Sequence, residues 1–329
     1  MSLGISHPGK IRVGVLRGGR SHEYSVSMQT GLHVLKNLPQ KYVPIDIYIS
    51  KEGVWHVGGL ERNPTKALEQ VDVVWNALHG KYGEDGKVQT ILDTLKKPYT
   101  GSQALASSMG MHKGFSKAAF SMFGLQTPHH IILSPKDNVR KNLIEIFQSF
   151  PQPSIVKPVD GGSSIAITVT YDFPSFERAV EFAFRHSGSV VVEEYIKGRE
   201  ATCGVIEGTD NKSIFALIPV ELVPDESKLF FDYQAKHGDG GSMVCPSTFS
   251  EDIKQEIQNL AIEAHRALGL RHYSRSDFIV SPQRGIFLLE ANSLPGLAQG
   301  SLFPVSLEAS GLTLSDFLDH VLTLTIKYG

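Results

Sequence analysis

Two oxygen-bearing side chains stand two positions apart at the end of an apolar run in the sequence GIFLLEANSLPG, residues 285–296. In a β-strand alternate side chains share a face, so Glu290 and Asn292 point the same way while Ala291 points to the other face. The preceding segment, SDFIVSPQR, predicts a hairpin that puts Asp277 opposite Glu290, within one residue. Asp277, Glu290 and Asn292 are therefore expected to converge on one face.

This set of oxygen donors is suited to a hard divalent cation. Two carboxylates held close together repel each other unless a cation lies between them. Because the set contains neither His nor Cys, it favours Mg²⁺, which binds one or two carboxylates together with substrate phosphates. Arg275 falls on the same side as Asp277 and would stabilise negative charge during a group transfer. The simpler alternative is a surface hairpin with solvated charges.

A second cluster, SIVKPVDGGSS, combines a lysine with a turn rich in glycine and serine. Lys157 ends an apolar strand, where an ammonium group is costly unless it meets an anion. The loop 160–164, which includes Ser163 and Ser164, offers backbone N–H groups and hydroxyls to phosphates. It is not a Walker A loop, because GxxxxGK[ST] occurs nowhere in the chain. The sequence predicts a flap over nucleotide phosphates. Taken alone, such a turn is more often an ordinary turn; the prediction depends on Lys157 before it and on the hairpin that contains Asp277 and Glu290 after it.

A third cluster, VVVEEYIKGRE, places acidic residues where a strand enters a turn. Glu193 and Glu194 end the strand, and Glu200 follows Gly198. Backbone groups at such a hinge can read an adenine edge, and a carboxylate can accept hydrogen bonds from ribose hydroxyls. The alternative is an acidic turn that is solvated.

The elements that position these clusters alternate between strand and helix patterns over residues 11–109, which indicates the α/β class. We expect three units: an N-terminal α/β substrate domain (1–109), a central unit (110–197) and a C-terminal metal-binding unit (198–329). Strands are predicted at 11–16, 43–49, 71–78, 130–133, 154–157, 165–170, 189–194, 201–206, 214–221, 277–280 and 286–290. Helices are predicted at 25–38, 86–95, 138–147, 175–185 and 251–268, with further helices toward the C-terminus. The polar insertion 224–247 is expected to be a functional loop.

Composition excludes several classes of protein. The 329 residues carry 32 basic and 34 acidic side chains, a formal charge of -2, which gives no general attraction to nucleic acid or to an anionic membrane. No apolar run approaches the roughly 20 residues of a membrane span. The two cysteines form no CxxC motif, and the N-terminus lacks signal-peptide features, so a cytoplasmic location is expected. The polar residues 1–10 are expected to lie outside the fold.

These motifs, in this order, resemble a known superfamily. Lys113, VKPVDGGSS, EEYIKGRE, SRSDF and LLEANSLPG are similar to the ATP-grasp superfamily. The segments GGRSHEYSVS, ALHGKYGEDG, PYTGS and FDYQAKH resemble the D-alanine:D-alanine ligases of bacterial wall synthesis. The resemblance covers nearly the whole chain from Ile11. It implies an ATP-grasp fold, α/β and α+β, with an N-terminal parallel-sheet, Rossmann-like (preATP-grasp) domain.

The resemblance also implies a reaction. ATP and two Mg²⁺ ions, with Mn²⁺ as a substitute, would convert one D-alanine to D-alanyl phosphate, and the amine of a second D-alanine would attack it. The product, D-alanyl-D-alanine, serves peptidoglycan. The resemblance implies a cytoplasmic homodimer formed through the N-terminal domain, with no nucleic-acid or membrane partner.

By the same resemblance, each cluster gains a role. ATP would be held by Lys113, Lys157, Ser163, Ser164, the hinge residues Glu193, Glu194, Tyr195 and Ile196, and the ribose contact Glu200. The metal ligands would be Asp277, Glu290 and Asn292, and the oxyanion hole would be Arg275 with the Gly296 amide.

The amino-acid contacts follow from the resemblance as well. Glu23 would bind the ammonium of the first amino acid, and His79 would lie near its carboxylate, which are chemically matched pairs. Ser301 and Leu302, helped by Lys236, would hold the second carboxylate. Without the resemblance, Glu23 would be an acid at a helix start and His79 an ordinary loop histidine.

The chain departs from the family where the acceptor is chosen. The family usually has a tyrosine after the lysine of DYxAK, contacting the positions of Glu23 and Ser163; this chain has His237. A protonated imidazole repels an ammonium but not a neutral hydroxyl, so we hypothesise an acceptor choice that depends on pH or shifts toward a hydroxy acid. The alternative is a conservative replacement that keeps the hydrogen bonding, since the rest of the loop found in depsipeptide ligases is not recognisable here. Leu294 replaces a small hydroxyl residue and would narrow or reshape the acceptor pocket. Ser25 replaces an acid and would either alter ammonium recognition or only change a helix cap.

The alternatives to a dipeptide ligase are therefore a D-alanine:D-lactate-type depsipeptide ligase and an ATP-grasp ligase for another amino acid or a carrier-bound amine. A nucleotide-binding regulator without catalysis is a further alternative. The intact set of Lys157, Arg275, Asp277, Glu290 and Asn292 argues against it, and the dipeptide ligase ranks first.

Overall fold

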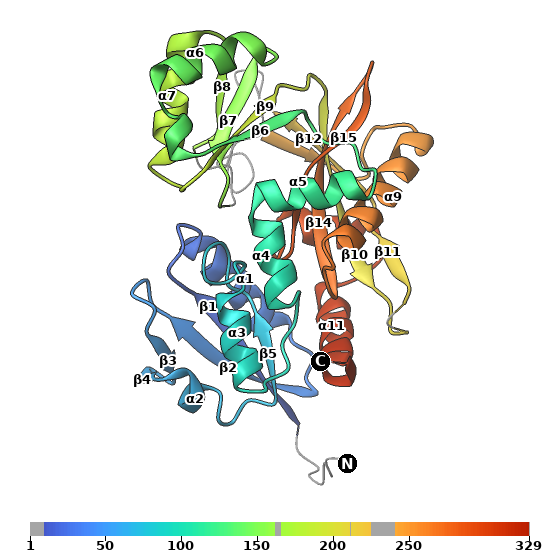
Figure 1. The fold of residues 1–329 in the computed structure, drawn as a ribbon. Helices are drawn as coiled ribbons and strands as arrows, with labels where there is room; N and C mark the ends of the chain where they lie inside the picture. Colours follow the sequence, from blue (N-terminus) through green and yellow to red (C-terminus); the bar gives the residue numbers. More distant parts are fainter. Residues whose placement is uncertain (1–9, 162–165, 211, 225–240, 329) are drawn as a thin grey trace.

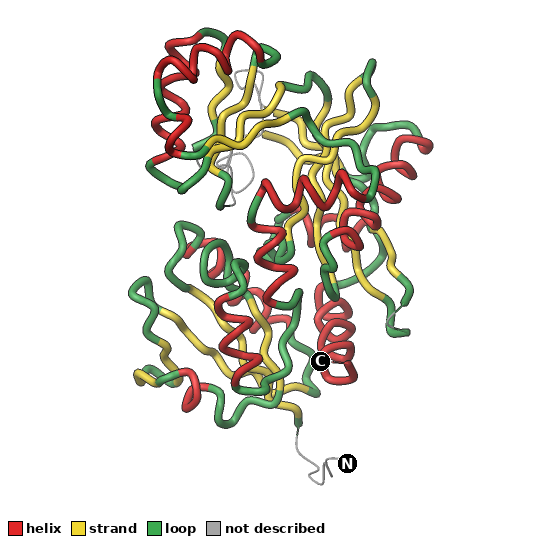
Figure 2. The backbone as a smooth tube through the Cα atoms, in the orientation of Figure 1, coloured by secondary structure: helices red, strands yellow, loops and turns green. Residues whose placement is uncertain are grey.

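The computed structural model describes residues 10–161, 166–210, 212–224 and 241–328. Three β-sheets, of five, four and six strands, organise these residues (Figure 1). Helices pack on the sheets (Figure 2), and their apolar faces form the cores between the layers. No helix in these ranges is long and apolar enough to cross a membrane.

The first sheet is N-terminal. Its strand order is β4 (Leu60–Arg62), β3 (Trp55–Val57), β2 (Tyr42–Ile49), β1 (Ile11–Gly18) and β5 (Val73–Asn76). β1 pairs in parallel with β2 and β5, and β3 and β4 add an antiparallel hairpin at the edge. The centre of β1 is apolar and buried on both faces because helices cover them: α1 (Tyr24–Asn37) on one, α2 (Pro64–Ala67) and α3 (Lys87–Thr94) on the other.

The C-terminal helix α11 (Leu314–Tyr328) completes the core of this first sheet (Figure 1). Alternate residues of β5 face opposite cores, and Trp75 points to the side of α11, where its ring meets Phe317 edge-on at a centroid distance of 6.1 Å. Tyr42 at the start of β2 donates a hydrogen bond of 2.7 Å from its hydroxyl to Asp319 of α11. The two ends of the chain therefore share one core.

Two helices, α4 (Ala104–Met111) and α5 (Lys113–Met122), lead to the second sheet. Its strands are all antiparallel, in the order β6 (His130–Leu133), β9 (Val190–Glu194), β7 (Ser154–Pro158) and β8 (Thr168–Thr170). Helices α6 (Arg140–Ser149) and α7 (Phe173–Phe184) pack on the outer face (Figures 1 and 2). The other face is therefore left toward the third sheet.

The third sheet has the order β13 (Gly241–Val244), β12 (Val220–Pro224), β10 (Arg199–Glu207), β14 (Tyr273–Ser281) and β15 (Gly285–Asn292), with β11 (Ile214–Ala216) also beside β10. Helix α9 (Glu251–Ala267) and α5 bury one face, and α10 (Leu302–Ala309) leads to α11. All strand pairs in this sheet are antiparallel.

The structure differs from the sequence predictions in identifiable places. The apolar run 214–221, predicted as one strand, forms two, β11 and β12, which pair with opposite ends of β10. Pro219, which has no N–H to donate to a ladder, lies between them. β14 begins at Tyr273 rather than Asp277, because it pairs with β10 along its whole length. The β3–β4 hairpin and helix α4 carry no clear apolar period and were not predicted.

Candidate functional site

The predicted hairpin is formed by β14 and β15, with Asp277 opposite Glu290 and Arg275 opposite Asn292. Ala291 is buried on the other face, as the two-residue period predicts. The register shifts between Asp277 and Phe278, so Leu289 is the extra residue of a β-bulge. The sequence pattern did not indicate this bulge.

The carboxylates of Asp277 and Glu290 lie opposite each other, as predicted. A positively charged side chain of the protein, the Arg275 guanidinium, lies beside Asp277. Arg275 donates from Nε and Nη2 to the two carboxylate oxygens of Asp277, each at 2.9 Å. Thr202 on the neighbouring strand β10 donates to Asp277 Oδ1 at 2.6 Å. Asp277 is thus held in one orientation by three hydrogen bonds.

The donor set fits a hard divalent cation in chemistry. Asp277, Glu290 and Asn292 offer carboxylate and amide oxygens only, the ligands that Mg²⁺ prefers. The Asn292 Oδ1 also accepts a hydrogen bond of 3.0 Å from the Leu294 N–H, which fixes the amide plane. Within the described ranges there is no group of three His, Cys, Asp or Glu side chains arranged for a metal, so a cation here requires the amide as well.

A cavity that we call the Ile196 pocket lies between the second and third sheets and has a volume of about 940 Å³ with its open mouth. Its wall is mainly apolar, with Ile155, Val169, Ile196, Leu222, Phe278 and Leu289, and it also contains the predicted residues Lys157, Glu193, Glu194, Tyr195, Glu200, Asp277 and Glu290. A mainly apolar cavity with a few polar groups in its wall is suited to a heteroaromatic ring.

At the wall of this pocket, the Lys157 ammonium meets an anion, as its burial requires, but the anion belongs to the protein. Lys157 Nζ lies 2.9 Å from Glu193 Oε2. Lys117 Nζ, from α5, lies 3.1 Å from Glu193 Oε1. Burial would raise the pKa of Glu193, but the two lysines lower it to about 2. Lys117 was missed in the sequence, although its spacing of four from Lys113 puts both on one helix face.

The other predicted hinge acid is also engaged. The Glu194 carboxylate forms an ion pair of 2.8 Å with Arg284, in the turn before β15, and accepts a hydrogen bond of 2.9 Å from the His129 N–H. Glu194 therefore ties the second sheet to the third sheet beside the pocket.

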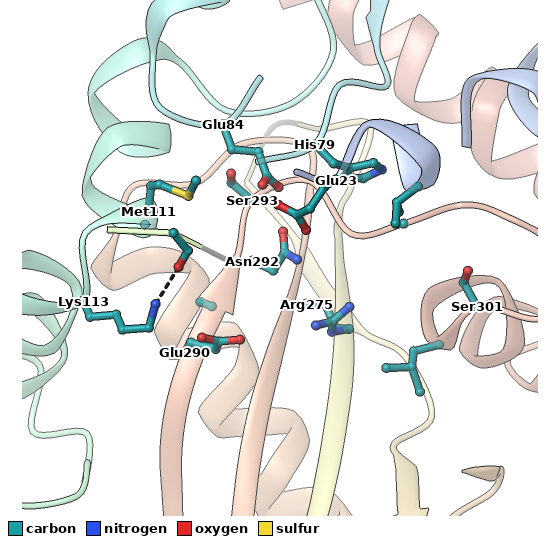
Figure 3. A pocket seen from close by; sticks show the side chains of 16 residues that line it. Glu23, His79, Glu84, Met111, Lys113, Arg275, Glu290, Asn292, Ser293 and Ser301 are labelled. Carbon is teal, nitrogen blue, oxygen red and sulfur yellow. Dashed lines mark hydrogen bonds between the residues drawn. The ribbon is translucent and has the colours of Figure 1, made fainter. Parts of the chain in front are cut away.

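Lys113 begins α5 and is almost fully buried. Its Nζ donates to the Gly161 carbonyl at 2.5 Å, drawn as the dashed line in Figure 3. Burial lowers the pKa of this ammonium. A cavity that we call the Asp160 pocket contains both Lys113 and Lys157, together with Asp160, Gly161 and Glu290. The two predicted phosphate-binding lysines therefore face one space.

A further cavity, the Glu23 pocket, has a volume of about 890 Å³ with its open mouth and brings together residues from distant parts of the chain (Figure 3). It is lined by the predicted residues Glu23, His79, Lys113, Arg275, Glu290, Asn292, Gly296, Ser301 and Leu302, with Glu84, Met111 and Ser293 among the others. Ser301 and Leu302 begin α10, and Glu23 precedes α1.

Contacts with α1 hold two parts of this pocket together. Thr30 lies 3.0 Å from His79 Nε2 through its hydroxyl, and the same hydroxyl accepts a hydrogen bond of 3.3 Å from the Leu297 N–H. His33 Nδ1 lies 2.6 Å from the Leu297 carbonyl. The loop 293–297 is thus attached to the N-terminal sheet through α1.

Glu84 is a site residue that was missed in the sequence. Its Oε2 accepts a hydrogen bond of 2.8 Å from the Gly80 N–H, and its side chain is buried beside Glu23 in the Glu23 pocket. Burial, and then the charge of Glu23, raise the pKa of Glu84 well above its usual value. The signal was the turn HGKYGEDG, dense in glycine and charge.

Two residues at which the chain departs from the family pattern, Leu294 and Ser25, do not line the Glu23 pocket. Leu294 is 2% exposed and packs in the core, with its Cδ2 only 2.8 Å from where a Cβ on Gly101 would lie. The expectation that Leu294 reshapes the acceptor pocket is wrong, since it faces the first sheet. Ser25 is exposed in the first turn of α1 and does not line the Glu23 pocket. Ser163, Ser164, Lys236 and His237 lie outside the described residues.

Comparisons with known proteins agree across the chain. A family model described as D-ala D-ala ligase C-terminus matches residues 119–323, and one described as D-ala D-ala ligase N-terminus matches residues 12–67 and 58–102. The D-alanine–D-alanine ligase of Trichlorobacter lovleyi is 35% identical, over 94% of this chain and 93% of its own. That of Clostridium beijerinckii is 33% identical, over 96% and 99%.

Solved structures give the same result. The D-alanine–D-alanine ligase from Coxiella burnetii superposes with a TM-score of 0.83 at 26% identity, covering 97% of this chain and 94% of that one. The VanG D-Ala:D-Ser ligase from Enterococcus faecalis superposes with a TM-score of 0.84 at 28% identity, covering 96% and 99%. The expected ATP-grasp fold with an N-terminal parallel-containing sheet is confirmed.

Proposed function

The chain belongs to the D-alanine–D-alanine ligase family of ATP-dependent ligases, and from this premise we propose that it joins two molecules of D-alanine. A carboxylate oxygen of the first D-alanine attacks the γ-phosphate of ATP, the bond to ADP breaks, and D-alanyl phosphate forms. The amine of the second D-alanine attacks the acyl carbon and phosphate leaves. The product, D-alanyl-D-alanine, serves peptidoglycan.

One observation carries this proposal: Glu290 lines the Ile196 pocket, the Asp160 pocket and the Glu23 pocket. A nucleotide in the first two and an amino acid in the third would meet at this residue. Transfer of a phosphoryl group needs such a meeting, because the reacting atoms must lie roughly 3–3.5 Å apart.

On the nucleotide side, adenine occupies the Ile196 pocket, with the hinge Glu193, Glu194, Tyr195 and Ile196 along its edge and Glu200 at the ribose. The phosphates lie toward Lys113 and Lys157, and Ser163 and Ser164 contribute further contacts to them. Asp277, Glu290 and Asn292 would hold two Mg²⁺ ions, or Mn²⁺ in their place. When bound, these ions neutralise the charge of the phosphates.

On the amino-acid side, the Glu23 carboxylate accepts the ammonium of the first D-alanine, and His79 lies near its carboxylate. Arg275 and the Gly296 amide stabilise the oxyanion of the tetrahedral intermediate. Ser301 and Leu302 bind the carboxylate of the second D-alanine, with Lys236. The protein acts in the cytoplasm as a homodimer with a domain organisation of 1–109, 110–197 and 198–329.

A second candidate differs in the acceptor only. One structural neighbour is described as a D-Ala:D-Ser ligase, and this chain has His237 in place of the family's tyrosine. Both observations favour testing D-serine and D-lactate beside D-alanine.

The test is ATP- and Mg²⁺-dependent phosphate release with D-alanine alone and with each alternative acceptor, from roughly pH 6 to 9, where an imidazole titrates. Products are identified by mass. D-Alanyl-D-alanine as the main product at every pH supports the proposal. A depsipeptide at low pH, or no product from any pair, contradicts it.

A further inference from the structure

The Glu193 carboxylate lies between two ammonium groups that come from different elements. Lys157 on β7 approaches one oxygen at 2.9 Å, and Lys117 on α5 approaches the other at 3.1 Å. Lys117 is 0% exposed and Glu193 is 1% exposed. This buried cluster therefore holds two cations and one anion.

The two lysines differ in what they face. Lys157 lines both the Ile196 pocket and the Asp160 pocket, whereas Lys117 lines neither. Lys117 also donates from Nζ to the Thr127 hydroxyl at 3.2 Å, which fixes the ammonium behind Glu193. A ligand in the pockets can thus touch Lys157 but not Lys117.

Charge explains why a second lysine is useful there. A pair of Lys157 and Glu193 alone would be neutral, and its ammonium would offer little attraction to an incoming anion. With Lys117 on the far oxygen, the cluster has one positive charge in excess, and that charge appears at the pocket wall through Lys157. Buried charge of this kind is costly unless an opposite charge compensates it. Two further charged groups act on this cluster, Lys113 and Glu290; they carry one charge of each sign and leave the excess in place.

We propose that Lys117 is a positioning residue for the phosphates of the nucleotide: it neutralises Glu193 from behind, so that the Lys157 ammonium is available to the polyphosphate chain. This rests on the proposed function only in that the ligand is an adenine nucleotide. Lys117 itself makes no contact with the ligand.

The test compares ligands that differ only in phosphate number. Affinities of adenosine, AMP and ADP are measured by calorimetry with the full chain and its Lys117→Met variant. We expect ADP affinity to fall about tenfold or more, the effect of weakening one charge-assisted hydrogen bond, with adenosine affinity within about twofold of the unaltered protein. Lys66→Met is the matched control. It removes an exposed lysine that pairs with Glu69 beside the first sheet and causes the same change in net charge, and it should alter neither the ADP affinity nor the adenosine affinity.

Two further variants separate charge from packing. Lys117→Arg keeps the cation and should retain most ADP affinity. Glu193→Gln removes the anion that the two lysines share, so the ratio of ADP affinity to adenosine affinity should rise above that of the unaltered protein. The same rise is expected when Glu193→Gln is combined with Lys117→Met. Melting temperatures identify any variant that does not fold, and Glu193→Gln then carries the test.

Equal losses for adenosine and ADP in Lys117→Met, or an unchanged preference for ADP in Glu193→Gln, would overturn the proposal. If the unaltered protein binds no adenine nucleotide, both the proposed role of Lys117 and the proposed function fail. If ADP binds as expected but no dipeptide forms, only the ligase assignment fails.

Discussion

Arg275 and Asp277, two residues apart on β14, are joined side by side by two hydrogen bonds of 2.9 Å between the guanidinium and both carboxylate oxygens. Both residues are largely buried. A planar fork of this kind fixes orientation as well as charge. The guanidinium is therefore oriented toward the Glu23 pocket before any substrate arrives.

This geometry predicts that Arg275→Lys preserves charge but not function. A lysine cannot make the two-pronged contact, so kcat should fall by on the order of 10²–10³-fold, the loss expected for one oxyanion contact, while the KM for ATP changes little. Steady-state kinetics check this. Arg12→Lys is the matched control, since Arg12 on β1 makes a similar fork to Asp72 at the protein surface. Equal effects in both variants would remove the special role of Arg275.

Gly80 is predicted to determine where the Glu23 carboxylate lies. It has φ +70, and a Cβ there would come within 2.4 Å of Glu23 Oε2. Gly80→Ala should therefore displace this carboxylate and raise the KM for the first amino acid. Gly269→Ala has a similar φ, +61, with nothing within 4 Å of its Cβ. Both variants should lose about 1–2 kcal/mol of stability, but only the first should change KM; a change in both would contradict the assignment.

Glu290→Gln should reduce the Mg²⁺-dependent turnover of the protein while leaving its fold intact. Glu290 is only half-buried, so the melting temperature of the Glu290→Gln variant should stay close to that of the unaltered protein. Mg²⁺-dependent turnover should fall by on the order of 10²-fold or more, because metal stabilisation of a transition state supplies several kcal/mol. Mn²⁺ binding, measured by electron paramagnetic resonance, gives a readout independent of activity. Undiminished Mn²⁺ binding would exclude Glu290 as a ligand.

His272 predicts how stability depends on pH. Burial, then the charge of Arg271, lower the pKa of this imidazole from 6.5 to about 3. Between these values the unfolded chain binds the proton and the folded chain does not. The free energy of unfolding should therefore fall as pH drops from 6.5 toward 3, with a slope approaching about 1.4 kcal/mol per pH unit.

The variant that tests this is His272→Asn. Asparagine tolerates the φ of +68 and can accept the Gly101 N–H hydrogen bond in place of Nδ1, but it does not titrate. Denaturant unfolding at several pH values should show a flatter dependence for His272→Asn than for the unaltered protein. The exposed His129→Asn serves as control; an equally flat profile there would point away from His272.

His237→Tyr tests the choice of acceptor. If a protonated imidazole repels an amine, tyrosine should raise the use of D-alanine relative to D-lactate near neutral pH. Competition between the two acceptors, with products separated by mass, measures this ratio. A ratio that does not move would show that His237 is not the selector.

The hairpin of β14 and β15 could be predicted from the sequence because its information is local. A strand, a turn with Pro282 and a second strand fix a register, and the two-residue period then places Asp277 and Glu290 on one face. The bulge at Leu289 could not be predicted, since a single extra residue leaves the apolar pattern unchanged. Lys157 was located from its own motif, a lysine that ends an apolar strand, whereas Glu23 was located only through the family resemblance.

Lys117 and Glu84 could not be found by the same reasoning. Each is a charged residue in a helix or turn, which in sequence reads as a solvated surface group. Their burial depends on contacts with Glu193 on β9 and with Glu23 before α1, which only the tertiary fold supplies. Leu294 shows the opposite error, because it adjoins the pocket residues in sequence but faces the core.

The packing of α11 on the first sheet has a consequence for how the chain is made. A ribosome delivers the strands of the first sheet before α11, yet one face of that sheet, with Trp75, is covered only when Phe317 arrives. Until then, the nascent first sheet presents an uncovered apolar face, the kind of surface that chaperones bind. The first sheet can therefore complete its core only after α11 has been synthesised.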